Sequence, residues 1–374
     1  MKFRVERDVF ADAVAWAARS LPVRPSAPVL AGLLIEAGES GLVLSAFDYE
    51  TSARAEIRAD VEVDGRVLVS GRLLADICRS LPDKPIDFDL TGAKLELKCG
   101  SGRFSLQTMP VDEYPSLPTV PAPSGVVTGE EFASAVSQAV TAAGRDDMLL
   151  VLTGVRIEIE GERMSLLATD RFRLSHRELT WRPASTDVSL AALVPAKVLS
   201  DTAKTLSGEV TISISPAGGE GIIGFEGHGP DGLRRTTTRL LDGDFPKVRS
   251  LFPSEHLTVA TVDRAELVNT VKRVALVAER NTAVQMKFAD NEVVLDSQSG
   301  DEAQATEAVD AVLTGDEIVT GFNPTYLLDG LTAINSDKVD LSFTQATKPV
   351  VISASDAADE SAFRYLLMPR RLLS

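Results

Sequence analysis

The sequence predicts an α+β protein made of three tandem repeats of one unit, each with an antiparallel sheet and two helices. Two helical segments recur along the 374 residues with their apolar positions preserved. Between them lie short segments in which apolar and polar residues alternate, as half-buried strands require. Together these observations favour repeated domains over one large domain.

The most regular repeated segment is a helix expected over residues 72–81. A second copy occupies 196–207, and a third begins at Asn323. Because the apolar positions recur at helical spacing, each copy is expected to bury one face. The alignment superposes one leucine and one acidic residue from each copy: Leu74, Leu199 and Leu327, and Asp76, Asp201 and Asp329.

Other landmarks support the same repeat. A second helix is expected near each start, at 10–14, 132–136 and 267–271. An acidic residue follows a strand in the first two repeats, at Asp48 and Asp170. Segments of alternating polarity predict strands at 54–57, 155–159, 210–214 and 339–343.

Proline-rich connections separate the repeats. Five prolines lie between Pro110 and Pro123, a density that disfavours helix and central strand and suits an extended connection. A second, shorter boundary runs from Pro246 to His256. The expected domains are therefore 1–123, 124–253 and 254–374.

Charge is strongly acidic overall but locally basic. The chain has 38 Lys and Arg against 54 Asp and Glu, a net charge of −16, which excludes a generally basic DNA-binding surface. Arg72 and Arg79 nevertheless lie within about 20° of each other on their helix, and Lys197 and Lys204 repeat them. Two interpretations stay open: a solvated face with ion pairs through neighbouring aspartates, or a basic lining around a hole through which DNA passes.

No pattern points to catalysis, a metal or a cofactor. The two cysteines form no C-x-x-C pair, and the three histidines lack ligand spacing. The segment 219–224 matches G-x-G-x-x-G, but residues 225–232 cannot start the helix that dinucleotide binding needs, so strand and turn are expected. No signal peptide or membrane-spanning run is present, so a soluble cytoplasmic protein is expected.

Several segments resemble the bacterial sliding clamp family, the β subunit of DNA polymerase III, over the whole chain. They include Arg24-Pro25, Asp76 to Pro82, Arg103 to Leu106, Ala168 to Leu174, Asp242 to Pro246, Gly321 to Tyr326 and Tyr365 to Pro369. The resemblance implies a processivity factor, not an enzyme: a head-to-tail homodimer closing a ring of pseudo-six-fold symmetry around duplex DNA. It implies an interface of Phe104 and Leu106 against Ala275 and Leu276, although the first two also suit ordinary inward-facing strand positions.

The resemblance also implies two kinds of binding residue. For DNA contact, the resemblance implies Arg24, which matches directly, and Arg145, which lies one position from the usual contact. The basic helix faces add Arg72, Arg79, Lys197, Lys204, Lys272 and Arg273. A pocket for a peptide motif is expected at Leu152, Gly154, Thr169, Arg173, Leu174, Pro246, Leu251, Asn323, Tyr326, Met368, Pro369 and Arg370. Its implied partners are the polymerase III α subunit, the clamp loader, and repair and translesion polymerases.

Departures from the family pattern leave alternatives open. Arg171-Phe172 stands where many members have Gly-His, and Arg370 stands where members usually carry an apolar residue. One alternative is therefore a duplicate clamp whose altered pocket gives resistance to a pocket-binding inhibitor. Another is an acidic scaffold that uses the pocket without encircling DNA.

Overall fold

The computed structural model describes residues 1–215, 221–278, 282–299, 302–355 and 363–370, and it forms two compact units. The first unit comprises Met1–Phe132, Trp181–Leu190 and Asp201–Leu240; the second comprises Ala133–Thr180, Ala191–Ser200 and Leu241–Ser374. The middle third of the chain contributes to both units. Each unit is organised around one continuous antiparallel sheet.

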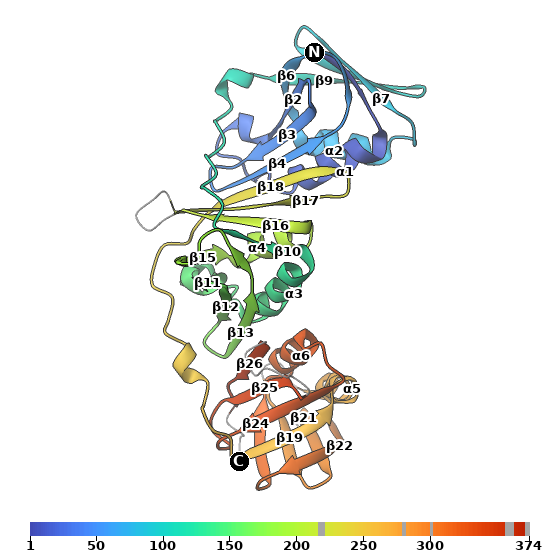
Figure 1. Cartoon of the computed structure of the whole chain (residues 1–374). Coiled ribbons are helices and arrows are strands. Elements are labelled where there is room, and N and C mark those ends of the chain that lie inside the picture. Colours follow the sequence, from blue (N-terminus) through green and yellow to red (C-terminus); the bar gives the residue numbers. More distant parts are fainter. Residues whose placement is uncertain (216–220, 279–281, 300–301, 356–362, 371–374) are drawn as a thin grey trace. The chain divides into compact units, whose positions relative to one another are not determined.

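All six helices expected from the repeat are confirmed (Figure 1). Side-chain caps fix three of their starts. Thr128 accepts the Glu131 amide at 3.2 Å, Asp263 accepts the Glu266 amide at 2.8 Å, and Asn323 accepts those of Thr325 and Tyr326 at 3.0 and 3.2 Å. The helices are α1 (Arg7–Ala18), α2 (Gly71–Ser80), α3 (Gly129–Ala139), α4 (Ala196–Ala203), α5 (Arg264–Val274) and α6 (Pro324–Ala333).

The first unit contains a 14-stranded sheet in the order β14-β10-β16-β17-β18-β4-β3-β2-β6-β9-β8-β7-β1-β5. Its strands are β1 (Lys2–Val5), β2 (Gly32–Gly38), β3 (Gly41–Phe47), β4 (Thr51–Ile57), β5 (Asp60–Val63), β6 (Gly65–Ser70), β7 (Ile86–Thr91), β8 (Lys94–Cys99), β9 (Gly102–Met109), β10 (Gly125–Thr128), β14 (Arg182–Pro183), β16 (Ser207–Ile214), β17 (Ile222–His228) and β18 (Gly232–Arg239).

The second unit contains a 12-stranded sheet in the order β15-β11-β12-β13-β26-β25-β24-β19-β22-β21-β20-β23. Its strands are β11 (Gly154–Glu160), β12 (Arg163–Thr169), β13 (Arg173–Thr180), β15 (Ser189–Pro195), β19 (Thr258–Asp263), β20 (Val284–Ala289), β21 (Glu292–Ser299), β22 (Ala303–Thr314), β23 (Ile318–Phe322), β24 (Lys338–Phe343), β25 (Val350–Ala354) and β26 (Phe363–Leu367). The four strand segments expected from alternating polarity lie within β4, β11, β16 and β24, so these predictions are confirmed.

Strand pairing joins one repeat to the next within each unit. β18 pairs with β4 in the first unit, and β13 pairs with β26 in the second. Buried Arg234 of β18 reinforces the first junction, because it forms an ion pair with Asp12 and lies 5.1 Å from the centre of the Trp16 ring on α1. The junctions therefore belong to the sheets, which explains why compact units and sequence repeats have different boundaries.

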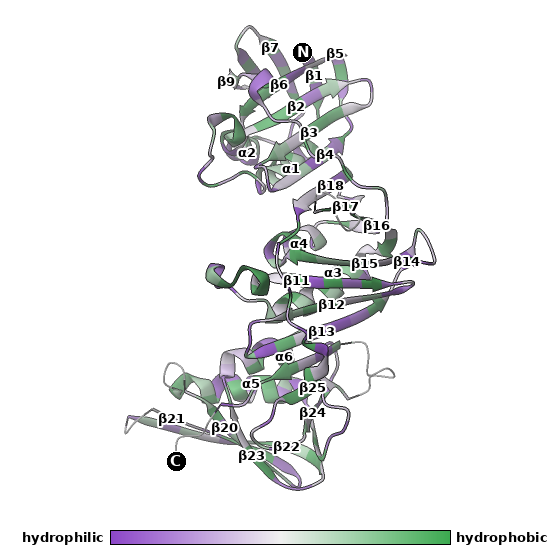
Figure 2. Ribbon diagram, turned by 90° about the vertical axis from the view of Figure 1, so that its left-hand side faces the viewer, coloured by the Kyte–Doolittle hydropathy of each residue, from purple (hydrophilic) through white to green (hydrophobic). Residues whose placement is uncertain are grey.

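Apolar faces of helices pack on these sheets as the sequence predicts. On α2, Leu74 and Cys78 are fully buried while Arg72 and Arg79 are exposed. Phe3 and Phe88 stack in the same core with ring centres 4.6 Å apart. In Figure 2 hydrophobic and hydrophilic residues both occur along the strands, as expected for sheets with one covered face.

The aspartates that follow β3 and β12 build the same turn twice. Asp48 accepts the amides of residues 50 and 51, and Asp170 accepts those of residues 172 and 173, at 2.6–3.1 Å. The residue after each, Tyr49 and Arg171, has a positive φ of 74° and 80°. The acidic landmark of the repeat is thus a turn former, and in the second repeat this turn carries part of the candidate site.

The strand expected from the segment that matches G-x-G-x-x-G is confirmed, since β17 begins at Ile222, within the match. Gly219 and Glu220 of that match lie outside the described residues. Among the described helices, none combines the length and apolar character that a membrane crossing requires.

Candidate functional site

A cavity of about 590 Å³ lies in the second unit, where the turn after β12 meets the start of α6 and the segment before β11. Its lining combines apolar, aromatic and charged side chains, the composition typical of a recognition site. The lining residues are Ala143, Gly144, Arg145, Asp146, Leu149, Leu152, Asp170, Arg171, Phe172, Arg173, Thr325, Tyr326 and Asp329.

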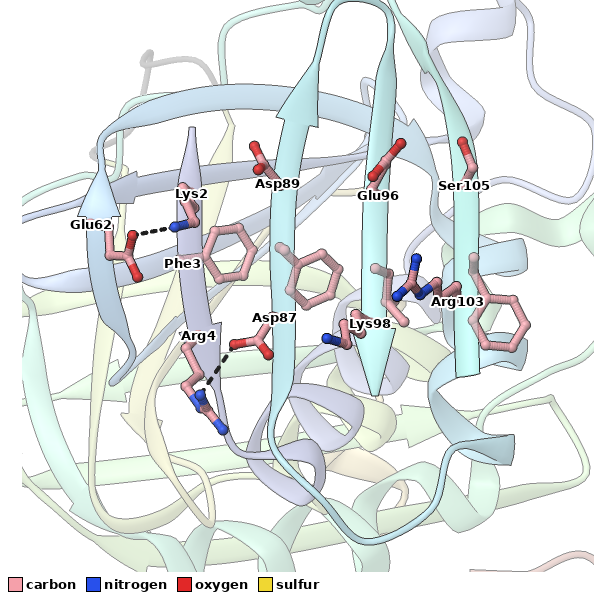
Figure 3. A pocket seen from close by; sticks show the side chains of 13 residues that line it. Lys2, Phe3, Arg4, Glu62, Asp87, Asp89, Glu96, Lys98, Arg103 and Ser105 are labelled. Carbon is pink, nitrogen blue, oxygen red and sulfur yellow. Dashed lines mark hydrogen bonds and ion pairs between the residues drawn. The ribbon is translucent and has the colours of Figure 1, made fainter. Parts of the chain in front are cut away.

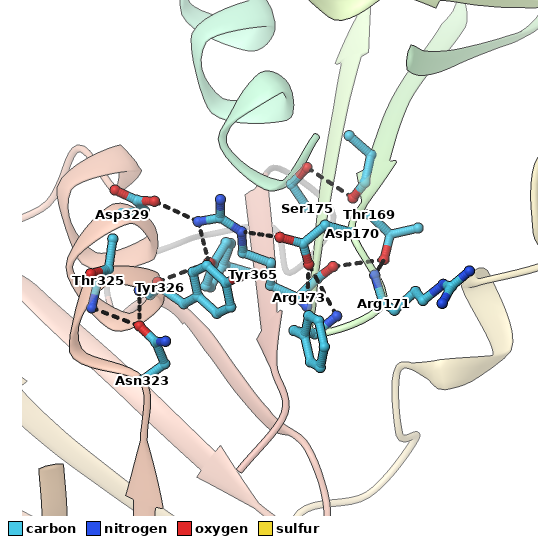
Figure 4. Close-up of polar contacts among 12 residues, drawn as sticks. Thr169, Asp170, Arg171, Arg173, Ser175, Asn323, Thr325, Tyr326, Asp329 and Tyr365 are labelled. Carbon is cyan, nitrogen blue, oxygen red and sulfur yellow. Dashed lines mark hydrogen bonds and ion pairs between the residues drawn. The ribbon is translucent and has the colours of Figure 1, made fainter. Parts of the chain in front are cut away.

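Arg173 organises one wall of this cavity (Figure 4). Its side chain is only 5% exposed and donates to Asp170 at 2.9 Å and to Asp329 at 2.5 Å. Asp170 belongs to the second repeat and Asp329 to α6 of the third, so one guanidinium links the two repeats. Two charge-assisted contacts on a buried cation hold this wall in one geometry.

Burial alone would lower the pKa of Arg173, but the Tyr365 hydroxyl and the two carboxylates outweigh it and raise the pKa. For Tyr365, whose neutral form is the protonated one, burial raises the pKa. The Tyr365 hydroxyl donates to the Tyr326 carbonyl at 2.8 Å. Arg173 therefore stays charged and Tyr365 stays protonated at neutral pH. The network is a fixed binding wall and offers no group poised for proton transfer.

An aromatic stack continues from this network to the surface. Tyr326 lies between the Arg173 guanidinium, 4.3 Å from its ring centre, and the Phe172 ring, 6.2 Å away and tilted by 26°. Phe172 is 54% exposed, and its carbonyl accepts the Met368 amide at 2.9 Å. The outer ring of the stack is thus available to a ligand while its inner layers are fixed.

The twelve residues predicted for the peptide pocket all belong to the second unit. Leu152, Arg173 and Tyr326 line the cavity. Leu174 instead joins a neighbouring apolar cluster with Leu167, Val248, Leu366, Phe245 and Phe252. Thr169 accepts the Arg171 amide and donates to the Arg173 carbonyl, Asn323 caps α6, and the Arg370 amide donates to the Gly321 carbonyl. Leu251 and Met368 are 54% and 39% exposed, Pro246 is exposed, Pro369 is half-buried and Gly154 is buried.

Most lining residues of the cavity were not predicted from the sequence, and among them Asp170, Phe172 and Asp329 shape the wall around Arg173. The first and third were noted only as landmarks of the repeat, and Phe172 only as a departure from a family pattern. The available signal was the two acidic landmarks themselves, Asp170 in the second repeat and Asp329 in the third. Both lie where a turn or a helix exposes its side chains. Only the fold shows that Arg173 lies between them.

The basic residues predicted to contact DNA are all exposed. Arg79 pairs with Asp76 at 3.2 Å, as the solvated-face interpretation expects. Arg72 donates to the carbonyls of Leu21 and Pro22, and Arg273 holds Glu307 at 2.6 Å. Each of these pairs is exposed and weak, so neither interpretation of the basic faces is excluded. Arg24, Arg145, Lys197, Lys204 and Lys272 complete the exposed set.

Within the described ranges, no group of three or more His, Cys, Asp or Glu side chains could hold a metal ion. Cys78 is buried, and burial raises the pKa of its thiol to about 12, which makes it a core residue.

Family comparisons cover nearly the whole chain. Residues 1–118 match the N-terminal domain of the DNA polymerase III beta subunit, residues 126–247 its central domain and residues 249–371 its C-terminal domain. The chain is 57% identical to the beta sliding clamp of Streptomyces coelicolor, covering 100% of both chains.

The chain belongs to the DNA polymerase III beta subunit family. Its three-domain fold is that of the bacterial sliding clamps. The sliding clamp of Bacillus subtilis matches it with a TM-score of 0.91 and 25% identity over 100% of both chains. A relative from Streptomyces muensis, the beta sliding clamp homolog GriR, is 44% identical over 99% of both chains. A Pseudomonas aeruginosa clamp solved bound to griselimycin shares the fold, with a TM-score of 0.91 and 24% identity over 100% of both chains.

One face of the clamp's first domain is hollowed by about 660 Å³ beside β9 (Figure 3). Two rows of side chains cross it from β1 to β9. One row ends in two adjacent basic residues, Lys98 opposite Arg103. The other contains two adjacent acidic residues, Asp89 opposite Glu96. Phe104 on β9 is 40% exposed, whereas Leu106 lies in the core at 3%.

His176 of this clamp is a buried histidine beside the candidate site. It is 2% exposed, packs 5.9 Å from the Phe252 ring, and lies 3.4 Å from an Arg364 nitrogen. Burial, with further contributions from Arg249 and Arg364, lowers its pKa to about 4, although Glu158 acts in the opposite direction. The folded protein therefore keeps His176 neutral through the range in which an unfolded histidine takes up a proton.

We expect stability to fall as pH drops from about 6.5 towards 4, because only the unfolded chain binds this proton. Between pH 7.5 and pH 5 the contribution of His176 is about 2 kcal/mol. Urea unfolding of His176→Leu at the two pH values should show a smaller pH dependence than the parent chain. His228→Gln, at an exposed histidine, is the control; an unchanged pH dependence in His176→Leu would contradict the prediction.

Proposed function

We propose that this chain is a DNA sliding clamp that closes around duplex DNA as a head-to-tail homodimer and tethers DNA polymerases through a peptide-motif pocket. The observation that carries the proposal is the repeated pair of exposed basic residues, Arg72 with Arg79 and Lys197 with Lys204, on a chain of net charge −16. Such a protein attracts phosphates locally and without sequence preference, yet cannot grip DNA over its whole surface. Enclosure then replaces affinity, and no catalytic step is required.

Two incompletely paired strands support the head-to-tail dimer. Among the described strands, β6 pairs with β9 only at Thr108 and Met109, and β19 pairs with β22 only from Ala311 onward. In both β9 and β22, the first part of the strand therefore has one side without a paired strand. This arrangement lets a partner strand add to a sheet. Exposed Phe104 near one edge and Leu276, 83% exposed, in the other unit supply apolar contacts. Two such heterologous contacts close a ring.

We assign the peptide pocket to the twelve residues predicted for it, with Phe172 as an additional wall. We assign DNA contact to the eight exposed Arg and Lys residues. The domain boundaries 1–123, 124–253 and 254–374 are retained as part of the proposal. The partners are duplex DNA, the polymerase III α subunit, the clamp loader, and repair and translesion polymerases, all in the cytoplasm. An apolar socket with a few fixed polar groups suits short peptide segments from such partners.

The decisive experiment loads the purified protein onto nicked circular DNA with a clamp loader and then linearises the circle. A ring should stay on the closed circle through gel filtration at high salt and leave the linear product through its ends. Equal retention on both forms would indicate ordinary binding, and retention on neither would favour the non-encircling scaffold.

Arg370 is the observation that favours a second candidate, a duplicate clamp with an altered pocket. A guanidinium at the pocket wall is expected to disfavour an apolar peptide anchor, because burying the anchor there desolvates a charge. Arg370→Val should therefore bind a clamp-binding peptide of a polymerase α subunit about tenfold more tightly, measured by fluorescence anisotropy. Equal affinities for the parent chain and the variant would exclude an altered pocket.

A further inference from the structure

A second groove, of about 810 Å³, lies in the second unit between the outer strands and the connection that begins after residue 243. Its floor is formed by β11 and β12, and one wall is the segment 244–250. The lining residues are Arg156, Glu158, Leu167, Asp244, Phe245, Pro246, Lys247, Val248, Arg249 and Ser250.

The groove is continuous with the proposed peptide pocket. Pro246 belongs to both, and Leu251 of the pocket comes directly after the groove wall in sequence. Leu167 on the groove floor packs in one apolar cluster with Leu174 of the pocket. A chain bound at Pro246 and Leu251 of the proposed pocket would therefore lie next to the groove.

Charge in the groove is unevenly matched. Glu158 is the single carboxylate shared by two guanidiniums, with Arg249 at 2.9 Å and Arg156 at 3.5 Å. Lys247 is exposed, and no ion pair joins it to another of the described residues. With Asp244 included, three cations face two carboxylates on a molecule that is otherwise strongly acidic. Because cations outnumber carboxylates in this lining, the groove favours an incoming carboxylate over an incoming cation.

We propose that this groove binds an acidic segment flanking the clamp-binding motif of a partner protein. The inference rests on the proposed function, because it places the flanking segment beside the same pocket. Arg249 and Lys247 would bind its carboxylates, while Leu167 and Phe245 would contact its apolar atoms. Partners with acidic flanks then bind more tightly than partners that carry the motif alone, which ranks competitors for one pocket.

The test compares five peptides by fluorescence anisotropy on the full chain. One is a clamp-binding segment of a polymerase α subunit, and the other four are the same segment extended at either end by a run of glutamates or of glutamines. We expect glutamates at one end to tighten binding about fivefold relative to glutamines, and salt to reduce this ratio. A ratio of one at both ends would overturn the inference.

Variants locate the effect. The ratio should approach one in Lys247→Gln combined with Arg249→Gln. It should persist in Arg163→Gln, a matched control on β12 whose side chain is 67% exposed and outside the groove. Glu158→Gln should raise the ratio, because the internal competitor for both guanidiniums is removed; a merely structural Glu158 would not do so. A ratio unchanged in the double variant would overturn the assignment.

Two further outcomes separate this inference from the proposed function. If the unextended peptide binds but the flank has no effect, the pocket stands and the groove assignment fails. If no peptide binds, both fail. Competition by a short DNA oligonucleotide at the groove, lost in the double variant, would assign the groove to nucleic acid and overturn the peptide proposal.

Discussion

Leu276→Lys is expected to convert the dimer into a monomer, so that the measured mass falls from about twice 40.0 kDa to 40.0 kDa. Leu276 is 83% exposed directly after α5, and it is one of the residues proposed for the dimer interface. A charge placed in the centre of an apolar contact loses the contact and is left desolvated, an effect of more than about 2 kcal/mol at such a position. Because the substitution alters both contacts of the ring, the two losses together correspond to a dimer weakened several hundredfold, more than about 4 kcal/mol.

Light scattering at micromolar concentration, or small-angle scattering with absolute mass calibration, measures the change. Leu257→Lys is the matched control, because Leu257 is 70% exposed in the same unit and has no assigned interface role. The variant should also lose retention on closed circular DNA. A Leu276→Lys protein that remains dimeric would remove Leu276 from the interface and leave the edges of β9 and β22, with exposed Phe104, to support the head-to-tail dimer.

Local patterns predicted the elements of the fold because the physics of those elements is local. The apolar spacing in 72–81 identified α2, and its repetition identified α4 and α6. Alternation located parts of β4, β11, β16 and β24. The boundary between compact units was not predictable in the same way, because it depends on which strand pairs across each junction.

The site was predicted only in part for the same reason. A family resemblance supplied Arg173 and Tyr326, but no spacing shows that Arg173 contacts Asp329, which lies 156 positions further along the chain. The exposed Phe172 stack also depends on α6 meeting the turn after β12. Leu106, expected at an interface or in a core, is buried in the core of the first domain.

Arg173→Ala is expected to lower the free energy of unfolding by about 3 kcal/mol and to abolish binding of the motif peptide. The side chain is 5% exposed, so its removal leaves two carboxylates facing a cavity without their cation. Asp170 is 14% exposed and has the larger desolvation cost, whereas Asp329, at 37%, is partly screened by water, which places the loss at the lower end for a broken buried pair. Tyr326 also loses the guanidinium that fixes one of its faces.

Urea unfolding and peptide anisotropy measure the two effects. Arg182→Ala, which breaks a pair with Glu209 whose side chains are 71% and 67% exposed, should cost less than about 1 kcal/mol and leave peptide binding intact. Asp170→Asn added to Arg173→Ala should recover part of the stability but none of the binding, because it removes an unpaired charge without restoring the wall. If Arg173→Ala unfolds like Arg182→Ala, the contact between Asp170, Arg173 and Asp329 contributes little to joining the second and third repeats. The β13–β26 pairing and the apolar cluster of Leu174 with Leu366 would then hold that junction.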